Sequence, residues 1–320
     1  MSELPPESRL WNLERGALTT KALAIVADLG VADALAEGPR SVAEVAAEAG
    51  ADADLLRRIL RALASDGVFV ETEPGVFGNT DASALLRQGA PGGWREFAHL
   101  FGGVFYSATE TLDPRATEAT FPRKFDTDFW SWLGENPDER AAFDRAMAGG
   151  KEGSAQRLAD LDWRGDETVV DVGGGNGALL RVLLELRPGL RGIVFDVPET
   201  ERDEATFPER MTFVAGSFFE RVPPGDAYVL SAILHDWDDE AATAILGTIR
   251  RAAAPETRLL VIEAVLAEDN EPNGVKWLDL LLHVLAAGRE RDETQWRELL
   301  DRAGFRIERL EDGLIEAKCR

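Results

Sequence analysis

The sequence is poor in side chains that form disulfides or bind metals. Its 320 residues include one cysteine, Cys319, near the C-terminus. One thiol provides neither an intrachain disulfide nor a pair of thiolate ligands, and we expect no bound metal. Only three histidines are present, at 99, 235 and 283. Any chemistry that needs an imidazole must therefore use one of these three.

Positive charge and long apolar runs are also scarce. The chain has 35 basic against 58 acidic residues, which gives a net charge of −23. Nucleic acids and anionic membranes repel such a surface. The most apolar stretch, 277–288, is too short and too interrupted to span a bilayer, and residues 1–10 lack the pattern of a signal peptide. We expect a cytoplasmic protein with no nucleic-acid or membrane partner.

The first part of the chain, residues 1–95, is predicted to form an all-α, winged-helix-like domain. Three amphipathic stretches and a hairpin turning at Pro74-Gly75 support this, at residues 17–35, 41–50, 51–67 and 68–80. Ser41 and Glu44 have the spacing of a helix capping box.

A winged helix can bind DNA, but this one lacks the charge for it. The arginines of its third helix (Arg57, Arg58 and Arg61) are offset by aspartates at 52, 54 and 66. We therefore interpret this domain as a dimerisation surface.

Residues 96–150 are predicted to form a helical connector with many aromatic side chains. Two interpretations are open: the rings form core, or some of them line an apolar ligand pocket between the domains. The six aromatics in question are Phe97, Phe101, Phe105, Tyr106, Phe129 and Trp130.

From about residue 166, predicted strands alternate with helices, which indicates a Rossmann-like α/β domain that completes the second region, 96–320. Its mostly parallel sheet should bind ligands at the carboxyl ends of the strands. The last two strands are joined by only three residues, too few for a crossover, so we expect an antiparallel hairpin. The strand candidates are 168–172, 191–197, 211–216, 226–233, 258–266, 305–310 and 314–319.

A glycine turn follows the first of these strands. Gly173, Gly175 and Ala178 fit the fingerprint of dinucleotide-binding turns. Asp171, however, would repel a pyrophosphate at the helix N-terminus and would attract the ammonium and sulfonium of S-adenosylmethionine. Asp196 ends the next strand and could accept the ribose hydroxyls of either cofactor. Asp171 therefore favours S-adenosylmethionine.

Five motifs occur in order along the chain: DVGGGNG (171–177), FDVP (195–198), LHDWDDE (234–240), VIEAVL (261–266) and GRERDETQW (288–296). Together they resemble the S-adenosylmethionine-dependent O-methyltransferases of phenolic compounds. This family includes caffeic-acid-type plant enzymes and bacterial enzymes that tailor aromatic natural products, some of them antibiotics. The resemblance implies a class I methyltransferase domain, an N-terminal dimerisation domain, a homodimer and an aromatic small-molecule substrate.

The resemblance also implies catalytic roles. His235 follows a strand and falls on the family's general base, while Glu263 and Glu290 fall on the two acids that orient it. A carboxylate on one ring nitrogen fixes the tautomer and raises the basicity of the other. Asp236 either contacts the substrate or caps the following helix. We expect His99 and His283 to be core or rim residues, although His283 could face the substrate.

The binding residues follow in the same way. The turn residues Asp171, Gly173 and Gly175, with Asp196, are assigned to the cofactor. Where the family often has an Asp-Met pair beside the adenine, this chain has Ser217 and Phe218, and where plant members have a lysine it has Ser231. Phe143 and Met147 match an element near the acceptor, although helix core is an equally good interpretation.

Two other enzyme classes stay open on the sequence. A relative could use the bound cofactor in hydroxylation or decarboxylation of a polyketide, although the histidine base argues against this. An NAD-dependent oxidoreductase would use the same glycine turn, but the chain has no Tyr-x-x-x-Lys pair.

Overall fold

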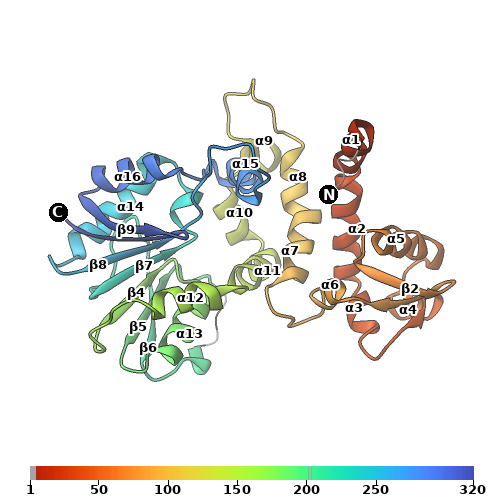
Figure 1. Ribbon diagram of the computed structural model, residues 1–320, viewed down its shortest axis with the longest axis horizontal. Helices are drawn as coiled ribbons and strands as arrows, with labels where there is room; N and C mark the ends of the chain where they lie inside the picture. Colours follow the sequence, from red (N-terminus) through yellow and green to blue (C-terminus); the bar gives the residue numbers. More distant parts are fainter. Residues whose placement is uncertain (1–4, 201, 203) are drawn as a thin grey trace. The chain divides into compact units, whose positions relative to one another are not determined.

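The computed structural model describes residues 5–200, 202 and 204–320. The chain divides into two compact units, and the break does not follow the sequence order strictly (Figure 1). The first unit contains residues 1–107 and 145–149, and the second contains 108–144 and 150–320. The domain limits expected from the sequence, 1–95 and 96–320, stay a prediction.

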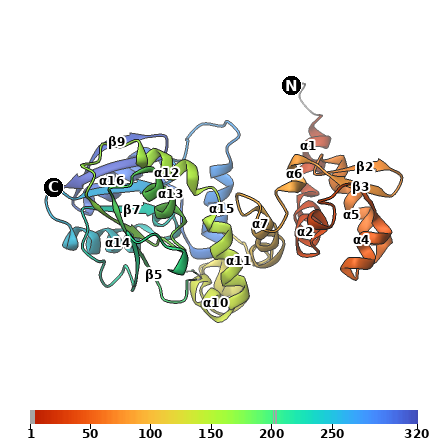
Figure 2. The same cartoon turned by 90° about the horizontal axis from the view of Figure 1, so that it is seen from below.

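The first unit combines short helices with a small sheet. Two of the predicted features are present, the capping box at Ser41 and the antiparallel pairing of 69–73 with 76–79. The two-residue strand β1 adds to this hairpin and was not predicted, because two residues carry no periodicity. Figure 2 shows the hairpin beside α4 and α5. The elements are α1 (Pro6–Glu14), α2 (Gly16–Asp28), α3 (Val31–Ala34), β1 (Arg40–Ser41), α4 (Val42–Ala49), α5 (Ala53–Ser65), β2 (Phe69–Glu73), β3 (Val76–Asn79), α6 (Asp81–Ala84), α7 (Trp94–Leu100), a π-helical turn (Phe101–Phe105) and α8 (Tyr106–Thr109, which continues into the second unit).

A seven-stranded sheet forms the centre of the second unit, in the order β6-β5-β4-β7-β8-β10-β9. All neighbouring pairs are parallel except those that involve β10, which runs antiparallel to β8 and β9. The predicted Rossmann-like, mostly parallel sheet and the terminal hairpin are thus confirmed. The strands are β4 (Thr168–Val172), β5 (Arg191–Asp196), β6 (Met211–Ala215), β7 (Ala227–Ser231), β8 (Arg258–Ile262), β9 (Phe305–Glu311) and β10 (Leu314–Cys319).

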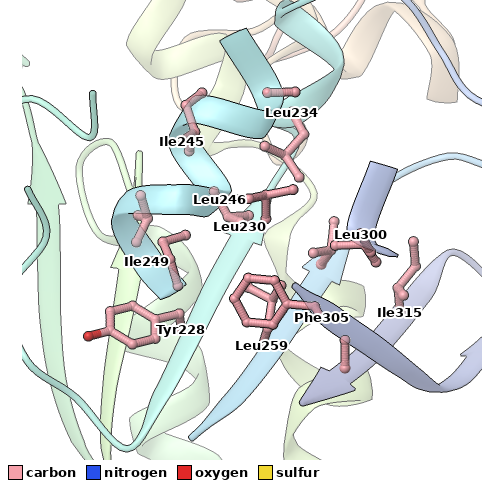
Figure 3. Packing of buried hydrophobic residues seen from close by; sticks show 14 of the residues in the cluster. Tyr228, Leu230, Leu234, Ile245, Leu246, Ile249, Leu259, Leu300, Phe305 and Ile315 are labelled. Carbon is pink, nitrogen blue, oxygen red and sulfur yellow. The ribbon is translucent and has the colours of Figure 1, made fainter. Parts of the chain in front are cut away.

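Helices cover both faces of this sheet, so its central strands are apolar on both sides. Tyr228 and Leu259 face α14 and α16, where they pack with Ile249 and Leu300 (Figure 3). Their neighbours along the strands face α12 and α13 on the other side. The helices of this unit are α9 (Thr120–Phe125), α10 (Phe129–Glu135), α11 (Pro137–Ala148, which continues into the first unit), α12 (Lys151–Ala159), α13 (Ala178–Leu186), α14 (Asp239–Ala252), α15 (Gly274–Ala286) and α16 (Glu293–Arg302).

The six connector aromatics are divided between the two units. Phe97, Phe101, Phe105 and Tyr106 lie in the first unit, and Phe129 and Trp130 lie in the second. Phe105 and Phe129 are buried, whereas Phe101 and Tyr106 are exposed. In the part of the chain that the structure describes, no helix is both long and apolar enough to cross a membrane.

Candidate active site

The central histidine lies just beyond the carboxyl end of β7. Ala232, directly after the strand, has a φ of +58°, which is uncommon for a residue with a side chain. The backbone then forms a 3₁₀ turn over Leu234–Asp236, which carries His235. The turn thus lies at the carboxyl edge of the sheet, where parallel α/β sheets bind their ligands.

Two buried glutamates meet the same nitrogen of His235. Its Nδ1 lies 2.9 Å from Oε1 of Glu290 and 3.4 Å from Oε2 of Glu263. Nδ1 carries at most one hydrogen, and the shorter distance identifies Glu290 as its hydrogen-bond partner. On the other side of the ring, Nε2 lies 3.7 Å from Oδ1 of Asp236. The structure therefore brings together the three residues to which the sequence assigns catalysis.

The three acids make the imidazole a strong base. Burial by itself would lower the pKa of His235, but Glu263, Asp236 and Glu290 outweigh burial and raise this pKa to about 10. Burial raises the pKa of Glu263, which the charge on His235 partly opposes. His235 and Glu263 thus hold protons more tightly than the same groups do in water.

Glu263 also accepts hydrogen bonds from the backbone of the histidine turn, a role that the sequence does not predict. Its Oε1 accepts hydrogen bonds from the backbone N–H groups of Ile233 (2.9 Å) and Leu234 (2.8 Å). Glu263 therefore fixes the backbone of the turn, whereas Glu290 makes the short bond to the ring. The backbone N–H of Glu290 in turn donates to Asp279 at 2.8 Å.

Arg291 is a component of the site that the sequence analysis missed. It is fully buried and donates to the carbonyls of Leu234 (2.9 Å) and Trp237 (2.8 Å), as well as to Asp239 at 2.9 Å. It thereby ties down both ends of the histidine turn. Its charge-rich surroundings in the sequence resemble a solvated loop, and only the tertiary fold shows that it is buried.

The structure decides between the two roles considered for Asp236. The helix cap is Asp238, whose Oδ1 accepts from the N–H of Ala241 at 2.8 Å, so the capping role of Asp236 is wrong. Burial is the main cause that raises the pKa of Asp236, to about 7, and His235 opposes it. Contact of this side chain with a substrate stays a prediction.

The arrangement of His235, Glu263 and Glu290 also has the dimensions of a metal site, because one ligand-type atom from each lies within 4.8 Å of the others. The same atoms hydrogen-bond to one another and to the turn. The expectation that the chain binds no metal stays a prediction.

The glycines of the turn have a packing reason that is independent of the cofactor role predicted for them. A Cβ on Gly173 would lie 2.4 Å from Cδ1 of Ile233, and one on Gly177 would lie 2.2 Å from Cε of Met211. A Cβ on Gly175 would meet nothing within 4 Å. All three have positive φ values. Gly177, absent from the predicted set, is the residue that permits close packing before α13, and open space lies next to Gly175.

Asp196 ends β5 in a fixed orientation. Its Oδ2 accepts from the N–H of Gly175 at 2.8 Å, and its Oδ1 accepts from the hydroxyl of Thr200 at 3.0 Å. Arg140, on α11, donates to the same hydroxyl at 2.7 Å. The carboxylate is therefore held beside the glycine turn, as expected for a group that accepts hydrogen bonds from a ribose.

An acidic and a basic side chain, Asp171 and Lys151, interact electrostatically near the glycine turn. Asp171 is 2% exposed, its Oδ2 has no hydrogen-bond partner among the described residues, and burial raises its pKa to about 7. Lys151, the first residue of α12, donates to the hydroxyl of Ser231 at 3.4 Å and acts electrostatically on Asp171. Ser231 is among the predicted residues, but Lys151 is not.

A row of aromatic rings connects the predicted adenine and substrate residues. Phe218 packs against Trp237, with 5.9 Å between ring centroids. Trp237 stacks on Trp130 at 6.1 Å, and Trp130 meets Phe143 edge-on at 5.8 Å. Trp237 and the place of Trp130 in this row were not predicted.

Two further predicted residues, Ser217 and Met147, are not members of this aromatic row. Ser217 accepts from the N–H of Phe219 at 3.3 Å. Met147 shares α11 with Phe143 but belongs to the first unit.

The other two histidines do not join the cluster of His235. His99 lies 2.8 Å from Asp28 in the first unit. His283 is exposed on α15 and lines a hollow of about 480 Å³ together with Leu112, Pro114 and Leu280.

The donor and acceptor set fits S-adenosylmethionine. A buried carboxylate with one oxygen that has no hydrogen-bond partner among the described residues suits an ammonium group. A glycine turn with open space suits close approach of a ligand, and an anchored carboxylate suits ribose hydroxyls.

Comparisons with known proteins identify the family to which the chain is similar. The O-methyltransferase domain family matches residues 105–306, and the O-methyltransferase dimerisation domain matches residues 11–89. The phenazine O-methyltransferase PhzM of Lysobacter antibioticus is 39% identical over 317 residues, which covers 96% of this chain and 93% of the relative. The phenazine-1-carboxylate N-methyltransferase of Pseudomonas aeruginosa is 32% identical and covers 99% and 97%.

Solved structures show the same likeness. The crystal structure of LaPhzM superposes with a TM-score of 0.92 at 38% identity and covers 99% of this chain and 100% of that one. The structure of NcsB1 from neocarzinostatin biosynthesis holds S-adenosyl-L-homocysteine and 1,4-dihydroxy-2-naphthoic acid. It superposes with a TM-score of 0.78 at 33% identity and covers 94% and 96%.

Proposed function

The chain belongs to the S-adenosylmethionine-dependent O-methyltransferase family, and on this premise we propose that it methylates a phenolic hydroxyl of an aromatic natural-product intermediate, with His235 as general base. The observation that carries the proposal is the hydrogen bond between His235 and Glu290 at the carboxyl edge of the sheet. Because the chain belongs to this family, we no longer consider an NAD-dependent oxidoreductase.

The basicity of His235 matches the proton it would remove. A phenol has a pKa near 10 and the pKa of His235 is raised to about 10, so transfer of the phenol proton to the neutral imidazole costs little free energy. Near neutral pH the ring is mostly protonated, and Nε2 has to release that proton before it can act as the base. Glu290 accepts the hydrogen on Nδ1, which leaves Nε2 to take the phenol proton. The resulting imidazolium lies between three carboxyl groups that stabilise it.

S-adenosylmethionine supplies, when bound, a methyl group on a positively charged sulfur. The chain's residues have to bring the phenolic oxygen into line with it and exclude water, which together can lower the barrier by roughly 7–11 kcal/mol. Glu263 and Arg291 serve this alignment because they fix the turn that carries His235. Both are positioning residues in this scheme.

Cofactor binding is assigned to the glycine turn and the two strand-end carboxylates. Gly173 and Gly175 provide the backbone, Asp196 would hold the ribose and Asp171 the ammonium group. Ser217 and Phe218 would bound the adenine. Ser231 contributes through its contact with Lys151.

The acceptor is assigned to the aromatic row. Phe143 and Trp130 present ring faces and edges that suit a flat aromatic molecule. Met147 and Asp236 are assigned to the same acceptor site from the sequence. The compounds named for the relatives, a phenazine and a naphthoic acid, are likewise flat and aromatic.

The assembly is proposed to be a cytoplasmic homodimer. The dimerisation family matches residues 11–89, and α1 and the start of α2 expose Leu10, Trp11, Leu13 and Leu18. Apolar side chains that cluster on a surface in this way favour association with another copy of the chain.

An assay with matched acceptors tests the reaction. The enzyme is incubated with methyl-labelled S-adenosylmethionine and pairs of naphthoic or phenazine compounds that carry either a hydroxyl or an amino group at the same position. We expect the label on the oxygen of the hydroxyl compounds. Label on nitrogen alone would support the reaction of the Pseudomonas relative. A hydroxylated or decarboxylated product without consumption of the cofactor would support the non-methylating alternative.

A further inference from the structure

The loop 287–292, which joins α15 to α16, contacts the histidine turn at several points. The backbone N–H of Arg289 donates to the carbonyl of His235 at 2.7 Å, and Oε1 of Glu290 lies 2.9 Å from Nδ1 of the same histidine. Arg291 donates to two further carbonyls of the turn. Three consecutive residues of the loop therefore hold both the backbone and the ring of His235.

Gly288 lies where this loop comes closest to the histidine turn. It is buried, and a Cβ at this position would lie 2.3 Å from the carbonyl oxygen of His235 and 2.9 Å from two backbone carbons of Asp236. Close contacts between a carbon and a carbonyl oxygen in proteins have distances of about 3.3–3.6 Å. The obstructing atoms belong to the backbone, so they cannot rotate away as the end of a flexible side chain can. A side chain at position 288 would therefore push the loop and the turn apart by roughly 1 Å.

The backbone conformation of Gly288 does not explain why it is a glycine. Its φ is not positive, so it does not adopt the left-handed conformation that favours glycine. The residue before it, Ala287, has that conformation with a φ of +56° and caps the end of α15. The glycine at position 288 is thus explained by the narrow space between the loop and the turn.

We propose that Gly288 is a positioning residue for methyl transfer: because it has no side chain, the loop lies directly against the histidine turn and keeps Glu290 within hydrogen-bond distance of the ring. A displacement of roughly 1 Å would lengthen the 2.9 Å contact beyond the range of about 2.7–3.2 Å in which such hydrogen bonds form. This inference rests on the proposed function, because it takes His235 as the base.

The loop carries one of the three acids that face the ring of His235. These are Asp236 in the turn itself, Glu263 directly after β8 and Glu290 in the loop. A displaced loop weakens the interaction with Glu290 and leaves the other two in place. The pKa of His235 should therefore fall without returning to the ordinary value of a histidine.

Gly288→Ala tests the inference, and Gly274→Ala is the matched control. Gly274 is the first residue of the same helix, α15, and a Cβ there would meet nothing within 4 Å. We expect Gly288→Ala to lower kcat about 10- to 100-fold for a phenol with a pKa near 10 and less than about fivefold for a phenol that is already ionised. The pKa of His235, measured by NMR, should fall, while the affinity for S-adenosylhomocysteine should stay within about threefold of the wild type. Gly274→Ala should leave all of these quantities unchanged.

The inference is wrong if Gly288→Ala keeps the wild-type pKa of His235, or if it lowers the rate equally for both phenols. If the variant does not fold, amide hydrogen exchange of the wild type tests the same contact. The N–H of Arg289, which donates to His235, should be protected, and exchange at the rate of an unfolded chain would overturn the inference. A wild type that methylates no phenol contradicts the proposed function, whereas the pKa measurement still decides whether Gly288 positions Glu290.

Discussion

Nδ1 of His235 lies 2.9 Å from Oε1 of Glu290, and this bond decides which ring nitrogen faces the proposed acceptor. With its hydrogen on Nδ1 directed to Glu290, the imidazole has Nε2 available as the proton acceptor. Glu263 meets the same side of the ring at 3.4 Å but uses its other oxygen for the backbone. The two glutamates therefore have different roles, which substitutions can separate.

The first prediction concerns the charge of Glu290. Glu290→Gln keeps an oxygen that accepts from Nδ1 but removes a negative charge, so the pKa of His235 should fall. We expect kcat for methyl transfer to fall roughly 10- to 100-fold. NMR titration of the three histidines, with His235 assigned from a His235→Asn variant, measures the pKa. Glu293→Gln, which changes an exposed acid paired with Arg297, is the control. An unchanged pKa in Glu290→Gln would contradict this account.

The second prediction concerns the backbone bonds of Glu263. Glu263→Ala leaves the N–H groups of Ile233 and Leu234 without their acceptor, whereas Glu263→Gln retains an oxygen for both. Each buried N–H without a partner costs about 1–3 kcal/mol. We expect Glu263→Ala to lower the free energy of unfolding in urea by roughly 2–4 kcal/mol and Glu263→Gln to lower it by less. Equal losses in the two variants would show that these bonds do not stabilise the turn.

The third prediction is a pH dependence of stability. Burial raises the pKa of Asp171 from 3.8 to about 7, so between these pH values the folded chain holds a proton that the unfolded chain has lost. The contribution of this group is therefore fully present below pH 4 and is lost as pH rises through 7.

Asp171→Asn removes this loss. Relative to the wild type, the variant should gain roughly 3 kcal/mol in free energy of unfolding between pH 5 and pH 8, since the proton is lost over about two pH units and each unit corresponds to about 1.4 kcal/mol. Chemical denaturation at the two pH values measures the difference. Asp171→Asn should also bind S-adenosylhomocysteine more weakly, because it lacks the carboxylate proposed to bind the ammonium group. A difference in stability that does not change with pH would show that Asp171 titrates normally.

The fourth prediction concerns assembly. Trp11 and Leu18 are 65% and 76% exposed, and a charge at both positions should prevent burial of this surface in a dimer. We expect light scattering to give a dimer for the wild type and a monomer for the double variant Trp11→Asp, Leu18→Asp. Leu186→Asp, at an exposed leucine of α13 in the second unit, should remain a dimer. A wild type that is monomeric at micromolar concentration would contradict the proposal.

Local patterns were sufficient to predict most of the second unit. Strands such as Thr168–Val172 are short apolar runs bounded by turn residues, and a three-residue connection forces the hairpin of β9 and β10. The last strand of the parallel part was predicted to run to residue 266 but ends at Ile262. The next residue, Glu263, is used by the histidine turn, and this contact is not encoded locally.

The missed residues are charged side chains that tertiary contacts bury partly, as for Lys151, or completely, as for Arg291. Lys151 and Arg291 lie in polar stretches, so the sequence indicates solvent exposure for both. Asp236 and Asp238 both suit a helix cap by residue type, and only the backbone shows which one caps α14. The grouping of His235, Glu263 and Glu290 could be predicted because the order of the motifs carries a family resemblance. Their unequal distances could not.

Single-turnover methyl transfer to phenols of graded acidity tests the role of His235 most directly. The rates of the wild type and His235→Asn are compared at pH 8 for phenols with pKa values near 10 and for phenols of the same ring acidic enough to be ionised already. We expect His235→Asn to lower the rate about 10²- to 10⁴-fold for the weakly acidic phenols and less than about tenfold for the ionised ones, which have no proton left to remove. An equal loss for both classes, or no loss for either, would contradict the assignment of His235 as the base.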